Sequence, residues 1–231
     1  MKQLPNTPKG VNYSDAPQRS DEWIQVRVGR VGASQLGRWL SVSKPNKDGE
    51  CRPLKARLDL EKEIAFEKTF NVPFSMYQTG AMQAGIDNES VVRQAYEAQT
   101  GNTVETAGCF YDEYSVASPD GLIGEDGGLE IKWLQDTNFM EVLSTHKPLP
   151  DHYLQTQGNL RLTGRKWWDY AVGNGNTGRF LVIRVERDED TIASITQSVA
   201  DVAKVKPFDT TDVYTLQQQV NNNDEEEILW T

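Results

Sequence analysis

The chain has 231 residues and a formal net charge of −10. This length can bury a substantial core and favours a single α/β domain over two small ones. The negative charge argues against a protein that coats DNA through long-range attraction.

Cysteine and histidine contents are both low. Cys51 and Cys109 are far apart and show no metal-ligand spacing, and the only histidines are His146 and His152. We therefore expect no zinc site and two free thiols, with Cys109 packed in a strand. The chain has no apolar run of membrane-spanning length and no apolar signal region near residue 1, so we expect a cytoplasmic protein without a membrane partner.

Turn residues and apolar spacing predict mostly helices in the first half of the chain. Residues 1–19, with three prolines, are typical of an extended arm. Helices are predicted at 21–27, after Gly32-Ala33, at 54–69 and at 80–99.

The second half mixes strands and helices. Two or three antiparallel strands are predicted within 103–134, and a strand pair at 166–172 and 179–187 across a glycine-rich loop. Further helices are predicted at 137–146, 151–162 and 190–205. We expect one domain over residues 20–207, followed by an acidic tail at 208–231.

One polar motif stands out in the strand region. Ser118-Pro119-Asp120-Gly121 is followed by Leu129-Glu130-Ile131-Lys132. A strand projects Glu130 and Lys132 onto one face, and Asp120 can reach that face from the preceding turn. Carboxylates suit Mg²⁺ or Mn²⁺, and a nearby lysine can orient hydroxide or stabilise charge during phosphodiester hydrolysis. The motif predicts a metal-dependent nuclease site.

An ordinary hairpin is the alternative interpretation of the same residues. Asp120-Gly121 and Asp126-Gly127-Gly128 are common turn sequences, and a Glu-x-Lys pair is frequent on exposed strands. On these residues alone the two interpretations are equally supported.

Several further motifs occur in a fixed order along the chain. They are Trp23–Gly29 with Gly32-Ala33-Ser34 close behind, Gly85–Glu89, Ser118–Gly121, Glu130–Lys132 and Tyr153–Gln157. Together they resemble the phage lambda exonuclease family, the YqaJ-type viral recombinases, which are a branch of the PD-(D/E)XK nucleases.

This resemblance implies a fold and an activity. The implied fold is a restriction-endonuclease-like α/β core with a central mixed β-sheet flanked by helices. The implied activity is a 5′-to-3′ exonuclease that uses Mg²⁺, with Mn²⁺ as a substitute, on one strand of linear duplex DNA. It also implies a ring-shaped homotrimer, a single-strand annealing protein as partner, and the host cytoplasm as location if the chain is phage-encoded.

The resemblance also implies site residues. Asp120, Glu130, the backbone carbonyl of Ile131 and Glu89, directly or through water, would hold the metal. Lys132 would assist hydrolysis, and Gln157 rather than Gln155 would point toward the catalytic centre. The competing interpretations are a surface pair of Glu89 with Arg93, four residues on, and a solvated glutamine.

Arg27 and Ser34 match the family positions that hold a 5′-terminal phosphate, with Ser118 as a third contact. A guanidinium and a hydroxyl suit that anion. Ser34 is equally compatible with a helix N-cap. The surrounding segment 27–57 carries eight basic residues against two acidic ones, which suits either a nucleic-acid path or an ordinary solvated surface.

Two other functions remain compatible with these motifs. An endonuclease of the same fold would use the same Asp, Glu and Lys, and only the phosphate pocket favours chain ends. A catalytically silent DNA-binding module is the other alternative, against which the intact Asp120, Glu130 and Lys132 argue. Trp167 and Trp168 can stack on bases, although adjacent strand residues face opposite ways, so at least one belongs to the core.

Overall fold

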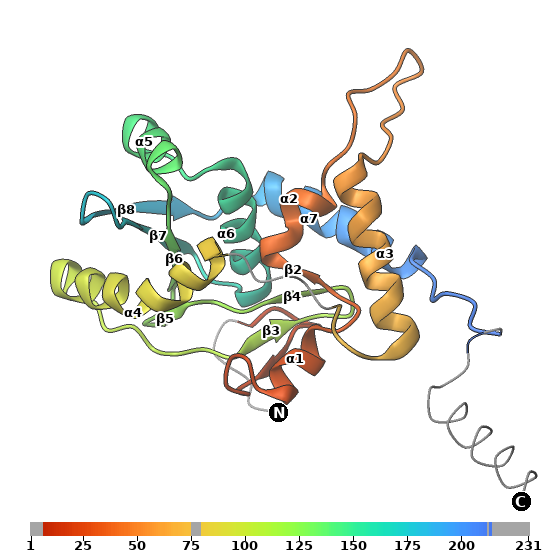
Figure 1. Ribbon diagram of the computed structural model, residues 1–231, viewed down its shortest axis with the longest axis horizontal. Helices are drawn as coiled ribbons and strands as arrows, with labels where there is room; N and C mark the ends of the chain where they lie inside the picture. Colours follow the sequence, from red (N-terminus) through yellow and green to blue (C-terminus); the bar gives the residue numbers. More distant parts are fainter. Residues whose placement is uncertain (1–6, 75–79, 212, 214–231) are drawn as a thin grey trace, which may run out of the picture.

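A computed structural model describes residues 7–74, 80–211 and 213. Two four-stranded mixed sheets lie among flanking helices (Figure 1). The first sheet has the order β1-β3-β4-β2, and only its β2–β4 pair is parallel. Its strands are β1 (Asn12–Ser14), β2 (Val31–Gly32), β3 (Cys109–Tyr111) and β4 (Ser115–Ala117).

The second sheet has the order β5-β6-β7-β8. Its strands are β5 (Gly121–Ile123), β6 (Gly127–Trp133), β7 (Trp167–Asn174) and β8 (Arg179–Glu186). The β5–β6 and β7–β8 pairs are antiparallel, whereas β6 and β7 are parallel. A parallel pair requires a crossover connection, and two helices between β6 and β7 provide it.

The helices begin and end close to the predicted residues. They are α1 (Asp21–Arg27), α2 (Leu36–Trp39), α3 (Lys55–Phe70), α4 (Gly80–Thr100), α5 (Asp136–Thr145), α6 (Pro150–Thr163) and α7 (Glu189–Val199), with 3₁₀ segments η1 (Ala33–Gln35) and η2 (Ala200–Lys204). Local chemistry sets several ends. Ser20 caps α1 by accepting from the amide of Trp23. Helix α6 starts with Pro150 and is capped at its C-terminal end by Gly164, whose φ is 69°.

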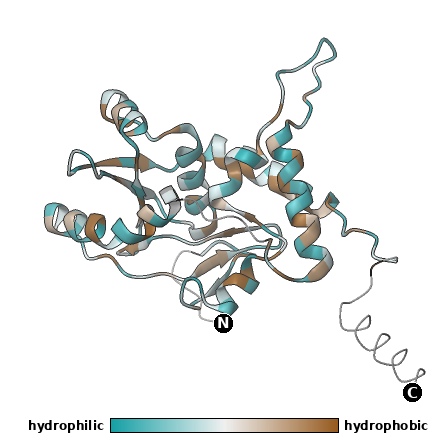
Figure 2. Cartoon of the chain, viewed as in Figure 1, coloured by the Kyte–Doolittle hydropathy of each residue, from teal (hydrophilic) through white to brown (hydrophobic). Residues whose placement is uncertain are grey.

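Helices cover both faces of the second sheet. α4 packs Val92 and Tyr96 against the face that carries Leu129 and Ile131. α5 and α6 cover the opposite face, where the buried aromatic side chain of Trp168 joins the core. Hydrophobic and hydrophilic residues alternate along the flanking helices (Figure 2). No helix among the described residues is long and apolar enough to cross a bilayer.

The strand region differs in detail from the expectation. Residues 103–134 form four short strands that are divided between two sheets, instead of two or three strands in one. The proline-rich arm supplies β1, which pairs with β3. Gly173 and Asn174, expected in a loop, extend β7 by pairing with β8. Most of the predicted acidic tail, residues 214–231, lies outside the described residues.

Two glycines of β6 make room for two tryptophans of β7. Gly127 and Gly128 pair directly with Trp167 and Trp168. A Cβ atom at Gly128 would overlap the ring of Trp168, which is fully buried. This close approach explains the Gly-Gly pair, which the sequence alone suggested was only a turn.

Gly128→Ala should therefore destabilise the protein by about 1–3 kcal/mol through overpacking. Urea denaturation measures the free energy of unfolding. Gly85→Ala is the matched control, because no atom lies within 4 Å of a Cβ at this position in α4. Alanine is the better helix former, so this control should stabilise by up to about 1 kcal/mol. Equal effects of the two substitutions would contradict the packing argument.

Candidate functional site

Glu130 is a buried carboxylate at the centre of the second sheet. It lies on β6 and is 1% exposed. Its Oε1 accepts hydrogen bonds from Lys132 Nζ at 2.6 Å and from Gln155 Nε2 at 2.5 Å. Its Oε2 accepts one from Asn159 Nδ2 at 3.0 Å. Strand alternation places Glu130 and Lys132 on the same face, as expected, and α6 supplies the two amides.

Asp120 stands at the turn between β4 and β5, next to β6. Its Oδ2 accepts a hydrogen bond from the amide of Ile131 at 2.6 Å. The turn is held from two sides, because Gln18 Nε2 donates to the carbonyl of Pro119 at 2.9 Å and Arg93 donates to the carbonyl of Asp120. The predicted convergence of Asp120 with Glu130 is thus produced by the β5–β6 pairing.

Burial and charge make this pair of carboxylates electrostatically unfavourable. Burial raises the pKa of Asp120 well above its ordinary value, and the nearby charge of Glu130 raises it further. Burial opposes the charge on Lys132, but Glu130 and Asp120 outweigh it, and the pKa of Lys132 is raised. Lys132 is therefore a cation near neutral pH and cannot act as a proton acceptor there.

The donor set fits a hard divalent cation. Mg²⁺ commonly takes one or two carboxylates and retains several waters. Among the described residues, no three His, Cys, Asp or Glu side chains are placed to hold a metal together. A cation here would therefore rely on Asp120 and Glu130, with neutral oxygens completing its shell. Asn159 Oδ1 is one nearby neutral oxygen, buried and without a hydrogen-bond partner.

Glu89 lies near these carboxylates but is engaged in another contact. Its Oε1 is 3.2 Å from Arg93 Nη2, which is the pairing four residues apart that the sequence offered as the alternative. Its charge nevertheless raises the pKa of Asp120. Glu89 and Asp120 both line a pocket of about 590 Å³, which is also lined by Asp15 and Arg19. Glu89 thus shares a pocket with Asp120 while its Oε1 is paired with Arg93.

The expectation that Gln157 points toward the carboxylates is wrong for this structure. Its Nε2 donates to the carbonyl of Glu186 at 2.8 Å, and its Oε1 accepts from the amide of Asp188 at 3.0 Å. It therefore anchors the end of β8. Gln155, judged the weaker candidate, makes the contact with Glu130 instead. Residues two apart on a helix face different ways, so only one of the two glutamines can face β6.

The sequence motifs did not point to two further polar residues at this site, His152 and Asn159. His152, Gln155 and Asn159 follow one another at helical spacing and form one polar stripe on α6. His152 Nδ1 lies 2.5 Å from the hydroxyl of Tyr170, a residue of β7 that pairs in register with Glu130. The sequence could have indicated these residues, because polar side chains at positions 152, 155 and 159 form one face of a helix that lies next to an apolar sheet.

Arg27 and Ser118 are brought together, as expected. Arg27 Nη1 donates to Ser118 Oγ at 2.7 Å, and the guanidinium lies 4.4 Å from the centre of the Trp23 ring. Burial lowers the pKa of Arg27. Within the described part of the chain, this guanidinium forms no ion pair. A partly buried guanidinium that forms no ion pair can bind an anion.

The glycine before Ala33-Ser34 lies beside the Arg27 guanidinium. A Cβ at Gly32 would lie 3.0 Å from Arg27 Nη2, so the glycine leaves space beside the guanidinium. Ser34 is exposed within η1. The alternative role of Ser34 as an N-cap is wrong, because Gly32 occupies that position.

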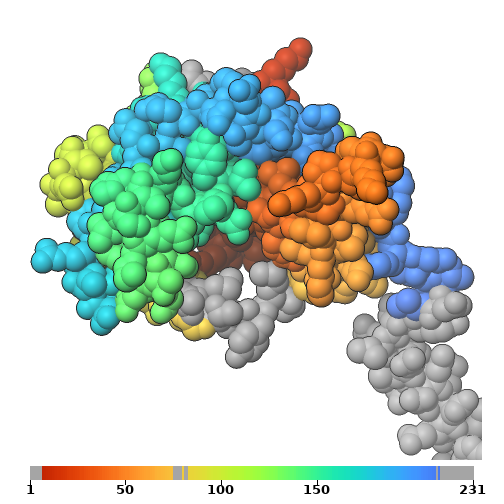
Figure 3. Space-filling view, turned by 90° about the horizontal axis from the view of Figure 1, so that it is seen from above, coloured from red at the N-terminus to blue at the C-terminus, as the bar shows by residue number. Residues whose placement is uncertain are grey.

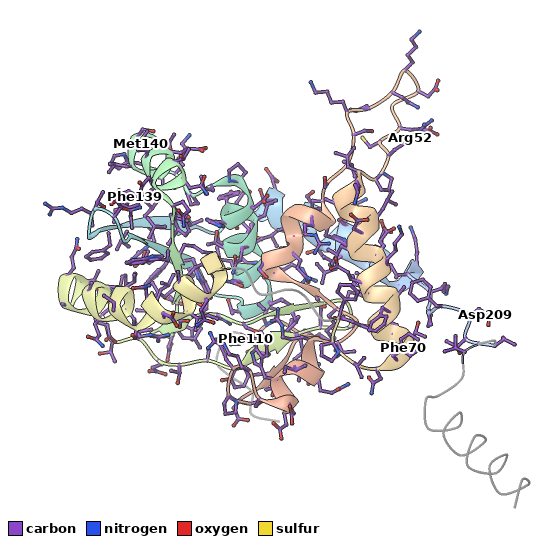
Figure 4. The ribbon with its side chains drawn as sticks, in the orientation of Figure 1. Arg52, Phe70, Phe110, Phe139, Met140 and Asp209 are labelled. Carbon is purple, nitrogen blue, oxygen red and sulfur yellow. The ribbon has the colours of Figure 1, made fainter. Side chains whose placement is uncertain are left out.

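Much of the positive charge in segment 27–57 is neutralised locally. Arg38 pairs with Glu63 at 2.6 Å, and Arg57 pairs with Glu61 at 2.7 Å. Arg52 lies on a loop that projects from the body of the molecule (Figure 4). In a view from above, α5 (green) and the α2–α3 segment (orange) flank a hollow (Figure 3).

Of the two adjacent tryptophans of β7, Trp168 is buried in the core. Trp167 is partly exposed, and the centre of its ring lies 3.5 Å from the guanidinium carbon of Arg184.

The fold is shared with solved nuclease structures. An alkaline exonuclease (LHK-Exo) from Laribacter hongkongensis aligns with a TM-score of 0.69 and 24% identity, covering 92% of this chain and 100% of the other. Its complex with dAMP aligns with a TM-score of 0.70 at the same identity and coverage. A phage-related exonuclease from Haemophilus somnus 129PT aligns with a TM-score of 0.60 and 13% identity, covering 76% of this chain and 92% of the other. These TM-scores establish a common fold, which confirms the expected nuclease-type α/β architecture.

The sequence itself assigns the family. Residues 22–166, more than half of the chain, match the YqaJ-like viral recombinase domain. The chain belongs to this family, as its ordered motifs indicated. No curated protein is significantly similar to it in sequence.

The raised pKa of Asp120 predicts how stability depends on pH when no metal is bound. Above the ordinary carboxyl pKa, the unfolded chain loses the Asp120 proton while the folded chain keeps it. Stability therefore falls with rising pH, by at most about 1.4 kcal/mol per pH unit, until the folded pKa is reached. Asp120→Asn removes this loss, so its advantage over wild type in free energy of unfolding should grow between pH 4 and pH 8.

Urea titrations in the presence of a chelator measure this difference. Asp126→Asn is the control, because Asp126 forms an exposed pair with Lys166 at 2.8 Å. An Asp120→Asn advantage that stays constant across this range would contradict the assigned electrostatics.

Proposed function

We propose that this chain is a Mg²⁺-dependent 5′-to-3′ exonuclease that digests one strand of linear duplex DNA for recombination by strand annealing. This proposal depends mainly on one observation, which is that the neighbouring carboxylates Asp120 and Glu130 lie beside the protonated Lys132. Membership of the YqaJ-like family and the common fold with two exonucleases support the same activity. Asp120 and Glu89 line a pocket of about 590 Å³, which supports access of a ligand to the Asp120 carboxylate.

Each site residue has a role within this proposal. Asp120, Glu130 and the carbonyl of Ile131 would hold Mg²⁺ or Mn²⁺, with Glu89 reaching it through water. The metal would lower the pKa of a water and offset charge on the phosphate. Lys132 would stabilise the negative charge that develops at the phosphate. Gln155 and Asn159 would keep Glu130 oriented, because both amides donate to it.

The direction of digestion would come from the pocket around Arg27. Its guanidinium is partly buried, forms no ion pair with the described residues and donates a hydrogen bond to Ser118, two residues before Asp120. A 5′-terminal phosphate held there, with Ser34 as an additional donor, would lie close to the carboxylates. An internal phosphate carries one fewer negative charge and continues into the chain at both ends, so this pocket favours an exonuclease over an endonuclease.

The proposal extends to assembly and partners. A ring-shaped homotrimer would enclose DNA, which suits a chain whose net charge of −10 gives little long-range attraction. A single-strand annealing protein would receive the exposed strand. The setting would be the cytoplasm, that of the host cell if the chain is phage-encoded. Sedimentation of the purified protein would test the trimer independently of activity.

Asp120→Ala and Glu130→Ala should lower cleavage of linear duplex by roughly a hundredfold or more, because each removes a metal ligand worth several kcal/mol. Lys132→Ala should lose most turnover and still bind metal. Millimolar Mg²⁺ should raise the melting temperature of wild type through mass action, and of Lys132→Ala, but not of the two carboxylate variants.

Asp126→Ala is the matched control for these carboxylates, since Asp126 lies in the same hairpin but faces Lys166 at the surface. It should retain wild-type rates. Substantial Mg²⁺-dependent cleavage by either Asp120→Ala or Glu130→Ala would mean that the site is wrongly placed. Nicking of closed circular DNA by wild type would favour an endonuclease.

Arg27→Ala should reduce the preference for 5′-phosphorylated over 5′-hydroxyl ends. A charge-assisted hydrogen bond contributes about 1.5–3 kcal/mol, so the preference should shrink roughly 10- to 100-fold. Rates on phosphorylated ends should fall toward those on hydroxyl ends, which should change little. An equal loss on both substrates would make Arg27 a general backbone contact or a structural residue.

A further inference from the structure

The His152–Tyr170 pair lies beside the carboxylates and has no role in the function proposed above. Tyr170 is fully buried and pairs in register with Glu130 across β6 and β7. Its hydroxyl contacts His152 Nδ1 at 2.5 Å, and the two ring centres are 5.5 Å apart. A buried tyrosine of the sheet thus fixes the orientation of a histidine ring on α6.

The environment decides which nitrogen of His152 carries a proton. Burial, and then the charge of Lys132, lower the pKa of His152 to about 4, so the ring is neutral near pH 7. Burial raises the pKa of Tyr170, and the charge of Glu130 adds to this, so its hydroxyl keeps its proton. The hydroxyl then donates, Nδ1 accepts, and the single ring proton resides on Nε2.

Nε2–H is consequently a donor available to a ligand. It forms no hydrogen bond with any residue in the described ranges, and His152 is partly exposed. Three other donors on this face, those of Lys132, Gln155 and Asn159, each already donate one hydrogen bond to Glu130. His152 shares the α6 stripe with the two amides, so its free donor lies at the same side of the carboxylate pair.

We propose that His152 Nε2–H donates a hydrogen bond to a non-bridging oxygen of the DNA phosphate undergoing hydrolysis, and that Tyr170 is the positioning residue that orients the ring. This proposal rests on the nuclease function proposed above. A neutral donor suits the place, because a second cation beside Lys132 would be repelled and a further carboxylate would repel the phosphate.

Kinetics on linear duplex DNA test the contact. His152→Leu retains bulk and removes the donor, so its kcat should fall roughly 10- to 100-fold with little change in KM. His152→Gln retains an N–H donor and should recover much of this loss. Tyr170→Phe should lower kcat less than His152→Leu, and adding it to His152→Leu should cause no further loss, because Tyr170 acts through His152.

His146→Asn is the matched control. His146 is the other histidine of the chain, is exposed and has a φ of 51°, which asparagine tolerates. It should leave kcat and KM unchanged. Equal losses in His152→Leu and His152→Gln, or additive losses in the double variant with Tyr170→Phe, would overturn the proposed donor role.

A nuclear magnetic resonance measurement supplies a readout that does not depend on turnover. The chain has two histidines, so only two rings contribute imidazole ¹⁵N signals. Spectra of His146→Asn identify the signals of His152. Wild type should show protonated Nε2 and unprotonated Nδ1, and a deoxynucleoside 5′-monophosphate as probe should shift Nε2. Tyr170→Phe should populate both tautomers. A wild-type ring protonated on Nδ1, or an Nε2 unaffected by saturating probe, would overturn the proposal.

The same kinetic measurements distinguish a missing His152 contact from a missing nuclease activity. Wild-type cleavage together with an unchanged kcat in His152→Leu would remove the His152 role and leave the nuclease function intact. A wild type that cleaves no linear duplex with Mg²⁺ or Mn²⁺ would remove the proposed function and the His152 role together. Melting temperatures of the variants close to wild type would attribute the kinetic losses to the contact rather than to unfolding.

Discussion

The burial of Glu130 is the constraint on which the rest of this site depends. A carboxylate that is 1% exposed must receive hydrogen bonds or a counter-charge, because an isolated buried charge is very costly. Lys132 supplies the charge, and Gln155 and Asn159 supply the hydrogen bonds. The crossover connection between β6 and β7 brings α6 over this face of the sheet. The contacts of α6 with Glu130 therefore belong both to the packing of the fold and to the site.

The burial of Glu130 also leaves an uncompensated negative charge at the site. Asp120 stands close enough to Glu130 for their charges to interact, and Lys132 offsets only one of the two. A divalent cation would remove the remaining repulsion, which links the proposed metal dependence to the geometry rather than to the motif alone. Fixing the Asp120 turn through Gln18 and Arg93 keeps the two carboxylates together despite their repulsion.

Local patterns anticipated much of the architecture. The helices began and ended near their predicted residues because caps, prolines and apolar periodicity act within a few residues. Alternation along β6 correctly placed Glu130 and Lys132 on one face. The division of the strands between two sheets was not predictable in this way, since β1 and β3 pair across almost one hundred residues of chain.

Residue types and strand alternation were enough to indicate paired carboxylates with a lysine, and the ordered motifs were enough to indicate the family. The choice of Gln155 over Gln157 and the His152–Tyr170 pair required the packed structure. The sequence motif identifies the two glutamines, but it does not determine which of their side chains faces β6. That depends on the rotation of α6 about its axis, which long-range packing against the sheet and α2 sets.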